Sequence, residues 1–216
     1  MSQVSRKAVM ATQQRAGRRK AVSDLKRGLI LDAARNVFEA DGLDGASLRA
    51  IAAAAGYTPA ALYFHFESKE QIYAEVLRDS LANLGQAVAR SVARTRAPAD
   101  RLRAAAMAFF RYYAENPRDL DLGFYLFRGG MKPHGLGKAR DDMLNSALKA
   151  ALHPIAAAAQ DLGVQPEEAR YLMVDTFAHA AGLLLLAHTG RMRMFGISAA
   201  NLMERFVESK ISALTG

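Results

Sequence analysis

The sequence predicts an all-α protein of about nine helices. After about residue 22, apolar residues recur at helical spacing in almost every segment. No segment alternates apolar and polar residues between turn signals, as a half-buried strand would. Hydrophobic residues make up 51% of the 216 residues, which is ample for a core, and the absence of cysteine excludes disulfides and thiolate chemistry.

The excess of positive charge is concentrated at the N-terminus. The net charge is +8, and residues 1–27 contain eight Lys and Arg residues against one acidic residue. Because residues 1–22 show no apolar periodicity, we expect them to form a disordered basic arm, either a solubilising tail or a segment that contacts phosphates. The arm lacks the apolar run of a secretory signal, and the apolar run at 180–187 is too short to span a bilayer, so we expect no membrane segment.

Three helices are predicted to follow the arm. The first runs from about residue 24 to residue 40, and Gly42 stops it. Ser47 can cap a second helix that Gly56 ends, and Thr58 can cap a third, which opens on a proline. The tight turn between the last two is typical of a helix-turn-helix unit, although an ordinary three-helix bundle uses the same residue types.

The rest of the chain predicts six more helices. Ser68 and Gln71 form a capping box at the start of the first of them, and glycines and prolines provide the breaks between the others. The expected ranges are 68–94, 99–115, 118–128, 138–161, 166–189 and 198–213.

Two segments near the N-terminus carry a specific set of motifs. They read ILDAARNVFEADG and ASLRAIAAAAGYTPAALYFHFESKEQIYAEVL, with F-x-x-x-G, S-L-R-x-I-A-x-x-A-G and L-Y-x-H-F-x-S-K-E in register. This stretch, residues 30–77, resembles the DNA-binding domain of the tetracycline-repressor (TetR) family of bacterial transcriptional regulators. The resemblance covers about a quarter of the chain. It implies a helix-turn-helix DNA-binding domain at 23–70, after the arm at 1–22, and a larger helical domain at 71–216 for effector binding and dimerisation.

The resemblance also implies which residues contact DNA. The third helix would enter the major groove, while side chains at its end and on the flanking helices would contact phosphates. Tyr63 could instead be a core aromatic, and Arg49 could simply be solvated. The implied positions are Ser47, Arg49, Thr58, Pro59, Ala60, Ala61, Tyr63, His65 and Lys69.

The predicted DNA-binding domain is acidic, and its third helix begins with apolar residues. Residues 28–80 contain four Lys or Arg and eight Asp or Glu, so the arm is the obvious source of positive charge for phosphates. The cations nearest the fold are Arg18, Arg19, Lys20, Lys26 and Arg27. Pro59, Ala60 and Ala61 offer the groove no hydrogen bonds, so we expect sequence recognition to depend on thymine methyls, DNA shape and arm contacts.

Aromatic and thioether side chains in the C-terminal part suit an apolar effector pocket, although such residues are more often plain core. The candidates are Phe109, Phe110, Tyr113, Tyr125, Met143, Met173, Phe177 and His179. Asp175 shares a helix face with His179, where it could orient the imidazole, form an interface contact or, on weak evidence, bind a metal with it. We expect neither a metal nor a cofactor.

Together these features predict a ligand-responsive transcriptional regulator in the cytoplasm, at the nucleoid. We expect a repressor that binds a palindromic operator in double-stranded DNA as a homodimer and that a small, largely apolar effector releases. The resemblance implies that the last two helices of each subunit form a four-helix dimer interface. An activator, or a regulator without a ligand, would have the same features. A helical enzyme is the most different alternative, but the sequence contains no G-x-S-x-G, no H-E-x-x-H and no phosphate loop, so we expect no enzyme.

Overall fold

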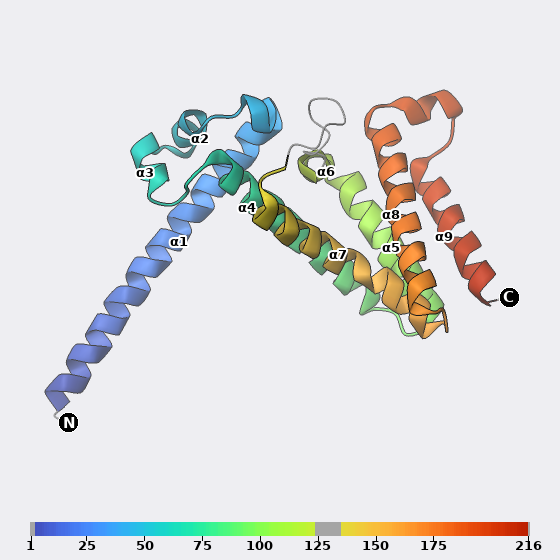
Figure 1. Cartoon of the computed structure of the whole chain (residues 1–216), viewed down its shortest axis with the longest axis horizontal. Helices are drawn as coiled ribbons and strands as arrows, with labels where there is room; N and C mark the ends of the chain where they lie inside the picture. Colours follow the sequence, from blue (N-terminus) through green and yellow to red (C-terminus); the bar gives the residue numbers. More distant parts are fainter. Residues whose placement is uncertain (1–2, 124–134, 216) are drawn as a thin grey trace. The chain divides into compact units, whose positions relative to one another are not determined.

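The computed structural model describes residues 3–123 and 135–215. Within these ranges the chain is all-α, as the sequence predicts, and no strand is present (Figure 1). The elements are α1 (Gln3–Gly45), α2 (Leu48–Ala55), α3 (Pro59–Tyr63), α4 (Lys69–Val92), α5 (Pro98–Glu115), α6 (Pro117–Gly123), α7 (Lys138–Asp161), α8 (Pro166–His188), the 3-10 helix η2 (Arg191–Phe195) and α9 (Ala199–Thr215).

The chain divides into two compact units, Met1–Val76 and Leu77–Gly216. Helix α4 contributes its first residues to the N-terminal unit and the remainder to the C-terminal unit.

The N-terminal unit is built on a small apolar core. Helix α2 contacts both α1 and α3. The rings of Phe38 in α1 and Tyr73 in α4 meet edge to face, with centroids 4.8 Å apart, and both side chains are fully buried. Ile51 of α2 and Leu62 of α3 are equally buried. These side chains hold the two short helices against the longer ones.

Local signals define the helix ends as the sequence predicts. The hydroxyl of Ser47 accepts a hydrogen bond from the Ala50 N–H at 3.1 Å, and that of Thr58 accepts one from the Ala61 N–H at 3.2 Å. Gly56 ends α2 in the left-handed conformation, with φ of 71°. Gly42 also has a positive φ, 69°, and interrupts α1 where the sequence predicts a stop.

The start of α4 has a variant of the predicted capping box. The Ser68 hydroxyl accepts from the Gln71 N–H at 3.2 Å, as expected. The Gln71 side chain, however, accepts from the N–H of Glu67 at 2.7 Å, one residue before the cap. The first hydrogen bond satisfies a backbone donor that the helix start leaves free, and the second satisfies the N–H of the residue before the cap.

The structure differs from the sequence prediction at the N-terminal end. We expected residues 1–22 to be disordered and the first helix to begin near Asp24, but α1 is helical from Gln3. Missing apolar periodicity reports that a segment is not buried, not that it is non-helical. Ala, Gln, Lys and Arg, which dominate this segment, all have high helix propensity, and no proline occurs before Pro59. A helix there is therefore compatible with the residues present.

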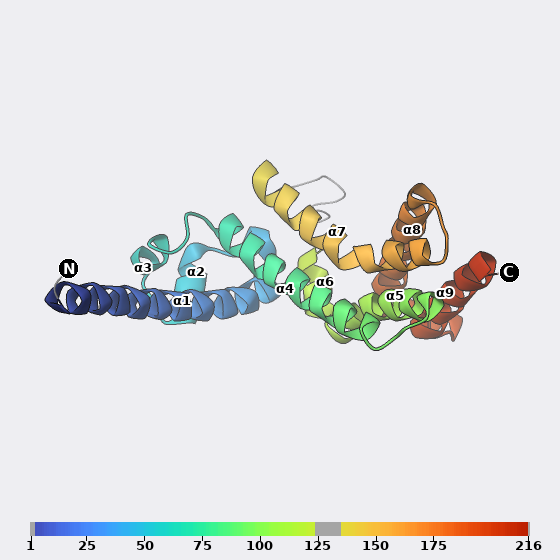
Figure 2. The ribbon, with the colours of Figure 1, turned by 90° about the horizontal axis from the view of Figure 1, so that it is seen from below.

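The C-terminal unit is a bundle in which α5 contacts α6, α7, α8 and α9 (Figures 1 and 2). Helices α8 and α9 run antiparallel and contact each other, and α7 also packs on α8. The core includes Phe109 and Phe110 of α5, Ile155 of α7 and Leu184 of α8. Of the predicted helix at 118–128, the part beyond Gly123 lies outside the described residues.

Helix α8 is the one described helix that is long and apolar enough to cross a membrane by length and composition. A single such helix is weak evidence, because a core or interface helix passes the same test. Its N-terminal half carries the charged residues Glu167, Glu168, Arg170 and Asp175, which a bilayer core disfavours.

The helical conformation of residues 3–20 can be tested by circular dichroism. Deleting residues 1–20 should lower the ellipticity per molecule at 222 nm in proportion to the helical residues removed. The substitution Ala21→Pro should lower it without shortening the chain, because proline in a helix interior costs about 3 kcal/mol. An unchanged signal per molecule in the deletion variant would show that the segment is not helical.

Candidate nucleic-acid interface and effector pocket

Helix α3 is anchored by a single buried residue. Leu62 is fully buried and anchors the helix on the core of the N-terminal unit. Pro59 and Ala60 are exposed in its first turn, and Ala61 is half-buried. At the other end the side chain of Tyr63 is 62% exposed, so it is not a core aromatic. The exposed face of α3 is therefore a smooth apolar surface with an aromatic end.

Phe64, which follows α3 directly, is the most exposed large apolar side chain of the structure's described part, at 88%. Phe64 is not among the predicted DNA-contact residues. The available signal was its position in the sequence. Leu62 and Phe66, two residues before and two residues after it, are both buried, and Phe64 lies on the opposite, outer side.

Helix α2 contributes an exposed cation. Arg49 lies in its first turn, and its guanidinium has no hydrogen bond or ion pair with any residue in 3–123 or 135–215. Ser47, also exposed, uses its hydroxyl oxygen as the cap acceptor, which leaves the O–H free to donate. Both side chains are thus available to an outside partner.

Lys69 is held against the backbone, a contact that the resemblance did not imply. Its ammonium donates to the carbonyls of Leu43, Asp44 and Ala46, at 2.8, 3.3 and 3.1 Å. These contacts use all three of its N–H groups. Lys69 therefore stabilises the loop between α1 and α2, and the partners are too distant in sequence for spacing to reveal them.

Arg27 is likewise a structural residue and not an arm cation. Its Nε donates to Glu75 Oε2 at 3.1 Å, and its Nη1 donates to the backbone carbonyl of His65 at 2.7 Å. Its Nη2 pairs with the other oxygen of the same carboxylate, and its guanidinium lies 4.2 Å from the centroid of the Phe66 ring. The side chain of Glu75 is only 11% exposed, so Arg27 neutralises a largely buried charge.

Four other cations of α1 form a stripe, and Lys20, which is also exposed, lies outside it. Arg15, Arg18, Arg19 and Lys26 are exposed, and they recur at i, i+3, i+4 and i+11, which places them on one side of a helix. We name these four residues the basic stripe. Within the described part of the chain none of them has an acidic partner, so the stripe is free to bind an anionic surface.

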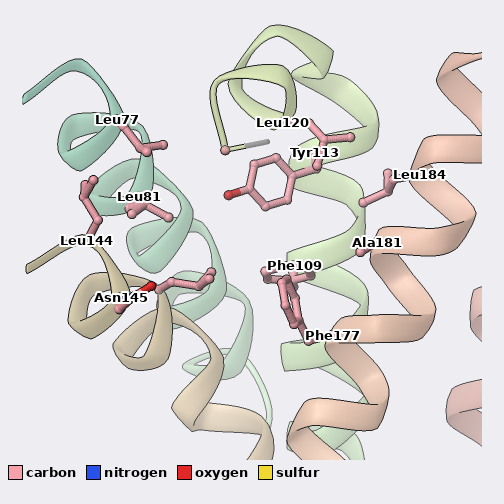
Figure 3. A pocket seen from close by; sticks show the side chains of 12 residues that line it. Leu77, Leu81, Phe109, Tyr113, Leu120, Leu144, Asn145, Phe177, Ala181 and Leu184 are labelled. Carbon is pink, nitrogen blue, oxygen red and sulfur yellow. The ribbon is translucent and has the colours of Figure 1, made fainter. Parts of the chain in front are cut away.

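The C-terminal unit contains an apolar cavity of about 110 Å³ (Figure 3). It lies among five helices, α4 to α8. Its wall includes Leu77 and Leu81 of α4, Phe109 and Tyr113 of α5, and Phe177 and Leu184 of α8. Helices α6 and α7 add Leu120, Leu144 and Asn145.

Three of the eight predicted pocket residues line this cavity: Phe109, Tyr113 and Phe177. Phe109 contacts the rings of both others edge to face, with centroids 5.3 and 5.8 Å away. The leucines of α4 and α7 were missed. Their helical spacing in the sequence, Leu77 to Leu81 and Leu144 to Leu148, was the available signal.

The other candidates have different surroundings. Phe110 is buried in the core and Met143 is 37% exposed, and neither lines the cavity. Met173 packs on a cluster of buried alanines in α7 and α8. Tyr125 lies outside the described residues. Residue type alone does not separate cavity residues from core residues, because each helix of this unit packs on several neighbours.

His179 also lies away from the cavity. Its ring stacks on Phe206 with centroids 4.1 Å apart, and its buried Nε2 has no partner among the described residues. Burial lowers the pKa of this imidazole. Asp175 does not orient it, because its carboxylate pairs with Lys210 at 2.6 Å. No group of three potential metal ligands occurs in the residues that the structure describes.

A buried polar cluster lies beside the cavity. The Tyr112 hydroxyl donates to the carboxylate of Asp119 and lies 3.3 Å from the backbone carbonyl of Ser80. Asp119 is 8% exposed. The pKa of the neighbouring Tyr113 hydroxyl is raised, first by burial and then by the proximity of Tyr112 and Asp119. The shift moves the ionisation of Tyr113 further from neutral pH, where a tyrosine hydroxyl is protonated in any case.

Comparison with known families gives a match in the N-terminal unit. A family model described as bacterial regulatory proteins, tetR family, matches residues 30–76. The transcriptional activator FasR of Mycolicibacterium smegmatis is 37% identical over 101 residues, which are 47% of this chain and 46% of FasR. The transcriptional repressor KstR2 of the same species is 45% identical over 56 residues, 26% of this chain and 27% of KstR2.

The chain thus spans about half or less of the length of the curated relatives it matches. Their names are those of transcriptional regulators, which supports the prediction that this chain is not an enzyme.

Solved structures match over most of the chain. A protein of unknown function from Rhodococcus sp. RHA1 has a TM-score of 0.71 at 21% identity, covering 88% of this chain and 96% of its own. FadR from Bacillus subtilis, solved in complex with stearoyl-CoA, has a TM-score of 0.65 at 17% identity, covering 85% and 97%. At such identities the likeness establishes the fold alone.

The Arg27 contacts predict a specific loss of stability. Arg27→Met keeps the aliphatic stem but leaves the Glu75 carboxylate and the His65 carbonyl without their donor. We expect the free energy of unfolding to fall by about 1–3 kcal/mol in urea denaturation. Arg78→Met is the matched control, because the Arg78–Asp79 pair is half exposed on both sides and should contribute less than about 0.5 kcal/mol. Equal effects of the two substitutions would contradict this role of Arg27.

Proposed function

Because the chain belongs to the tetracycline-repressor family of bacterial transcriptional regulators, we propose that it binds a palindromic operator in double-stranded DNA as a homodimer. We further propose that a small, largely apolar effector bound in the cavity of the C-terminal unit releases it. The observation that carries the DNA-binding part is α3, a short helix with one buried anchor, Leu62, and an otherwise exposed outer face.

In this proposal α3 enters the major groove. Thr58, Pro59, Ala60 and Ala61 lie at its start, nearest the base edges. The hydroxyl of Thr58 already caps the helix, and the other three side chains have no polar atom. Close approach and contact with thymine methyls are what this surface can supply, so specificity also depends on DNA shape.

Phosphate contacts come from the residues around α3. Arg49 supplies an unpaired guanidinium, Ser47 and Tyr63 supply hydroxyl donors, and His65 an imidazole at the helix end. Lys69 acts indirectly, by stabilising the loop that precedes α2. The basic stripe on α1 adds four positive charges, whereas residues 28–80 of the DNA-binding domain have a net negative charge.

An acyl compound is the effector class that we favour. Eight of the twelve described residues that line the cavity are leucine or phenylalanine, which bind hydrocarbon without specific orientation. FadR, which shares the fold, is solved in complex with stearoyl-CoA. No metal or cofactor enters the proposed mechanism.

The dimer is proposed to form through α8 and α9. Tyr171, Val174 and Leu185 of α8 are each more than half exposed, although the helix is strongly apolar. A second copy packed on this face would bury them and give a two-fold assembly, whose symmetry the operator would share. We place the protein in the cytoplasm, at the nucleoid.

An activator is the second candidate. The relative whose similarity extends over 101 residues, FasR, is named as an activator, whereas KstR2 is named as a repressor. The sign of regulation depends on where the operator lies relative to the promoter, so a reporter gene driven by the native promoter, with and without the protein, distinguishes the two.

Selection of binding sites from random DNA tests the proposal. We expect a palindrome whose half-sites are rich in T at the positions that face α3, and release of that DNA when stearoyl-CoA or another long-chain acyl compound is added. Half-sites read by α3 mainly at G would contradict the methyl-contact model. Absence of any selected palindrome would contradict the dimeric DNA-binding function itself.

The basic stripe predicts a salt-dependent contribution to DNA affinity. Replacing Arg15, Arg18 and Arg19 by Gln should weaken operator binding and reduce the slope of log K against log salt by about 0.9 for each phosphate that the variant no longer neutralises. The matched control is a triple exchange of exposed cations in the C-terminal unit, Arg94, Arg96 and Lys149 to Gln. If the stripe variant keeps both the affinity and the slope of the wild type, the stripe does not contact DNA.

A further inference from the structure

Three exposed apolar side chains lie close together just after α8. Met194, Phe195 and Ile197 are 79%, 62% and 49% exposed, and we name these three residues the apolar tip. The 3-10 helix η2, which carries the first two, buries Met192. The apolar tip is therefore presented by an anchored turn. Adjacent exposed apolar side chains on such a turn are typical of a contact surface.

Two cations flank the apolar tip. Arg191 and Arg193 are exposed, and neither side chain has an ion pair within the part of the chain that the structure describes. A partner that fits this segment would cover apolar side chains and supply negative charge beside them.

A groove with the matching chemistry lies between the start of α8 and the end of α9, and its volume is about 210 Å³. Its apolar lining comes from Val164, Leu172, Ala213 and Leu214. Glu168 also lines it, and Glu168 and the adjacent Glu167 are exposed, with no ion pair inside residues 3–123 and 135–215. The other charged lining residues, Asp175 and Lys210, pair with each other at 2.6 Å. The groove thus combines an apolar lining with unpaired negative charge.

The apolar tip and the groove lie at opposite ends of the α8–α9 pair. The two helices are antiparallel, and η2 lies in the segment that joins the end of α8 to the start of α9 (Figure 1). The groove lies at the other end of both helices. Because α8 has 23 residues, its two ends are roughly 35 Å apart, and the tip of a chain does not reach the groove of the same chain.

A second copy of the chain can bring the two surfaces together. Tyr171, Val174 and Leu185 give α8 an exposed apolar face on which the α8 of a partner can pack. A two-fold axis perpendicular to α8 makes the two helices antiparallel, so each tip lies at the end of the partner that holds the groove. A two-fold axis parallel to α8 brings the arginines of the two tips together, and likewise the glutamates, which is unfavourable. Charge complementarity therefore favours the antiparallel arrangement.

We propose that the apolar tip of each subunit docks in the groove of the other, where Arg191 and Arg193 pair with Glu167 and Glu168 of the partner subunit. The inference rests on the proposed homodimer and specifies its register. Two-fold symmetry repeats the contact at both ends of the interface. An anionic membrane would suit the arginines of the tip but not the glutamates beside the groove, so a second copy is the partner that uses both surfaces.

Charge reversal in two separate variants tests this contact. The tip variant carries Arg191→Glu and Arg193→Glu, and the groove variant carries Glu167→Lys and Glu168→Lys. Sedimentation of the full chain over a dilution series gives the dimer Kd of the wild type, of each variant and of their equimolar mixture. Each variant alone should dimerise at least about tenfold more weakly than the wild type, because like charges then face each other at both ends. The mixture should return to within about threefold of the wild type, because every facing pair in the heterodimer is again of opposite sign.

Recovery in the mixture separates a contact between subunits from a folding defect, which a second defective chain does not repair. Arg18→Glu with Lys20→Glu is the matched control, because these exposed cations have the same spacing but lie in the N-terminal unit. This control should leave the dimer Kd unchanged. Phe195→Gln removes apolar area without changing the charge, and it should weaken the dimer about fivefold or more.

The outcomes distinguish this contact from the dimer as a whole. Wild-type affinity in both charge variants, or a mixture that dimerises no more tightly than either variant, would overturn the docking of tip and groove and leave the homodimer intact. Binding of the wild type to phosphatidylglycerol vesicles that the tip variant loses, with an unchanged dimer Kd, would overturn it in favour of a membrane contact. A wild type that stays monomeric at every concentration would overturn the proposed homodimer itself.

Discussion

Arg27 contacts Glu75, Phe66 and the carbonyl of His65, and these contacts hold the segment that follows α3. Helix α3 has five residues, too few to be stable by itself, and buries only Leu62. Its orientation therefore depends on the segment that follows it. Arg27 fixes that segment to both α1 and α4, with the guanidinium satisfying a backbone carbonyl and a nearly buried carboxylate at once. The outer face of α3 can remain exposed because its support comes from residues outside it.

The parts of the fold that were predictable from sequence are those with local causes. Ser47, Gly56 and Thr58 each act on backbone within four residues, so residue type and position were enough to locate the ends of α2 and α3. The roles of Arg27 and Lys69 depend on partners 48 and 26 residues away, and no spacing rule reveals such pairs. Apolar periodicity failed at the arm for a different reason: it detects burial, and an exposed helix of Ala, Gln, Lys and Arg has none to detect.

The residues that line the cavity were only partly predictable from residue type. An inventory of aromatic residues included Phe109, Tyr113 and Phe177, which line it, but also Phe110 and Met173, which pack elsewhere. Helix α5 contacts four other helices, so most of its circumference is apolar and its sequence cannot say which side faces a void. The location of the cavity follows from where the side chains of five helices fail to fill space, a property that no single helix encodes.

The helical conformation of α1 before its interruption at Gly42 changes the free energy with which this segment binds any surface. A flexible tail must lose backbone entropy when it settles on a partner, about 1–2 kcal/mol for each residue that becomes ordered. A segment that is already helical avoids most of that loss, so each cation of the basic stripe contributes more net binding free energy than the same residue on a disordered tail. The rigid segment also gives up adaptability. A helix advances about 1.5 Å per residue, so the spacing of its charges is set in advance, and it suits partners whose own charges are regularly spaced.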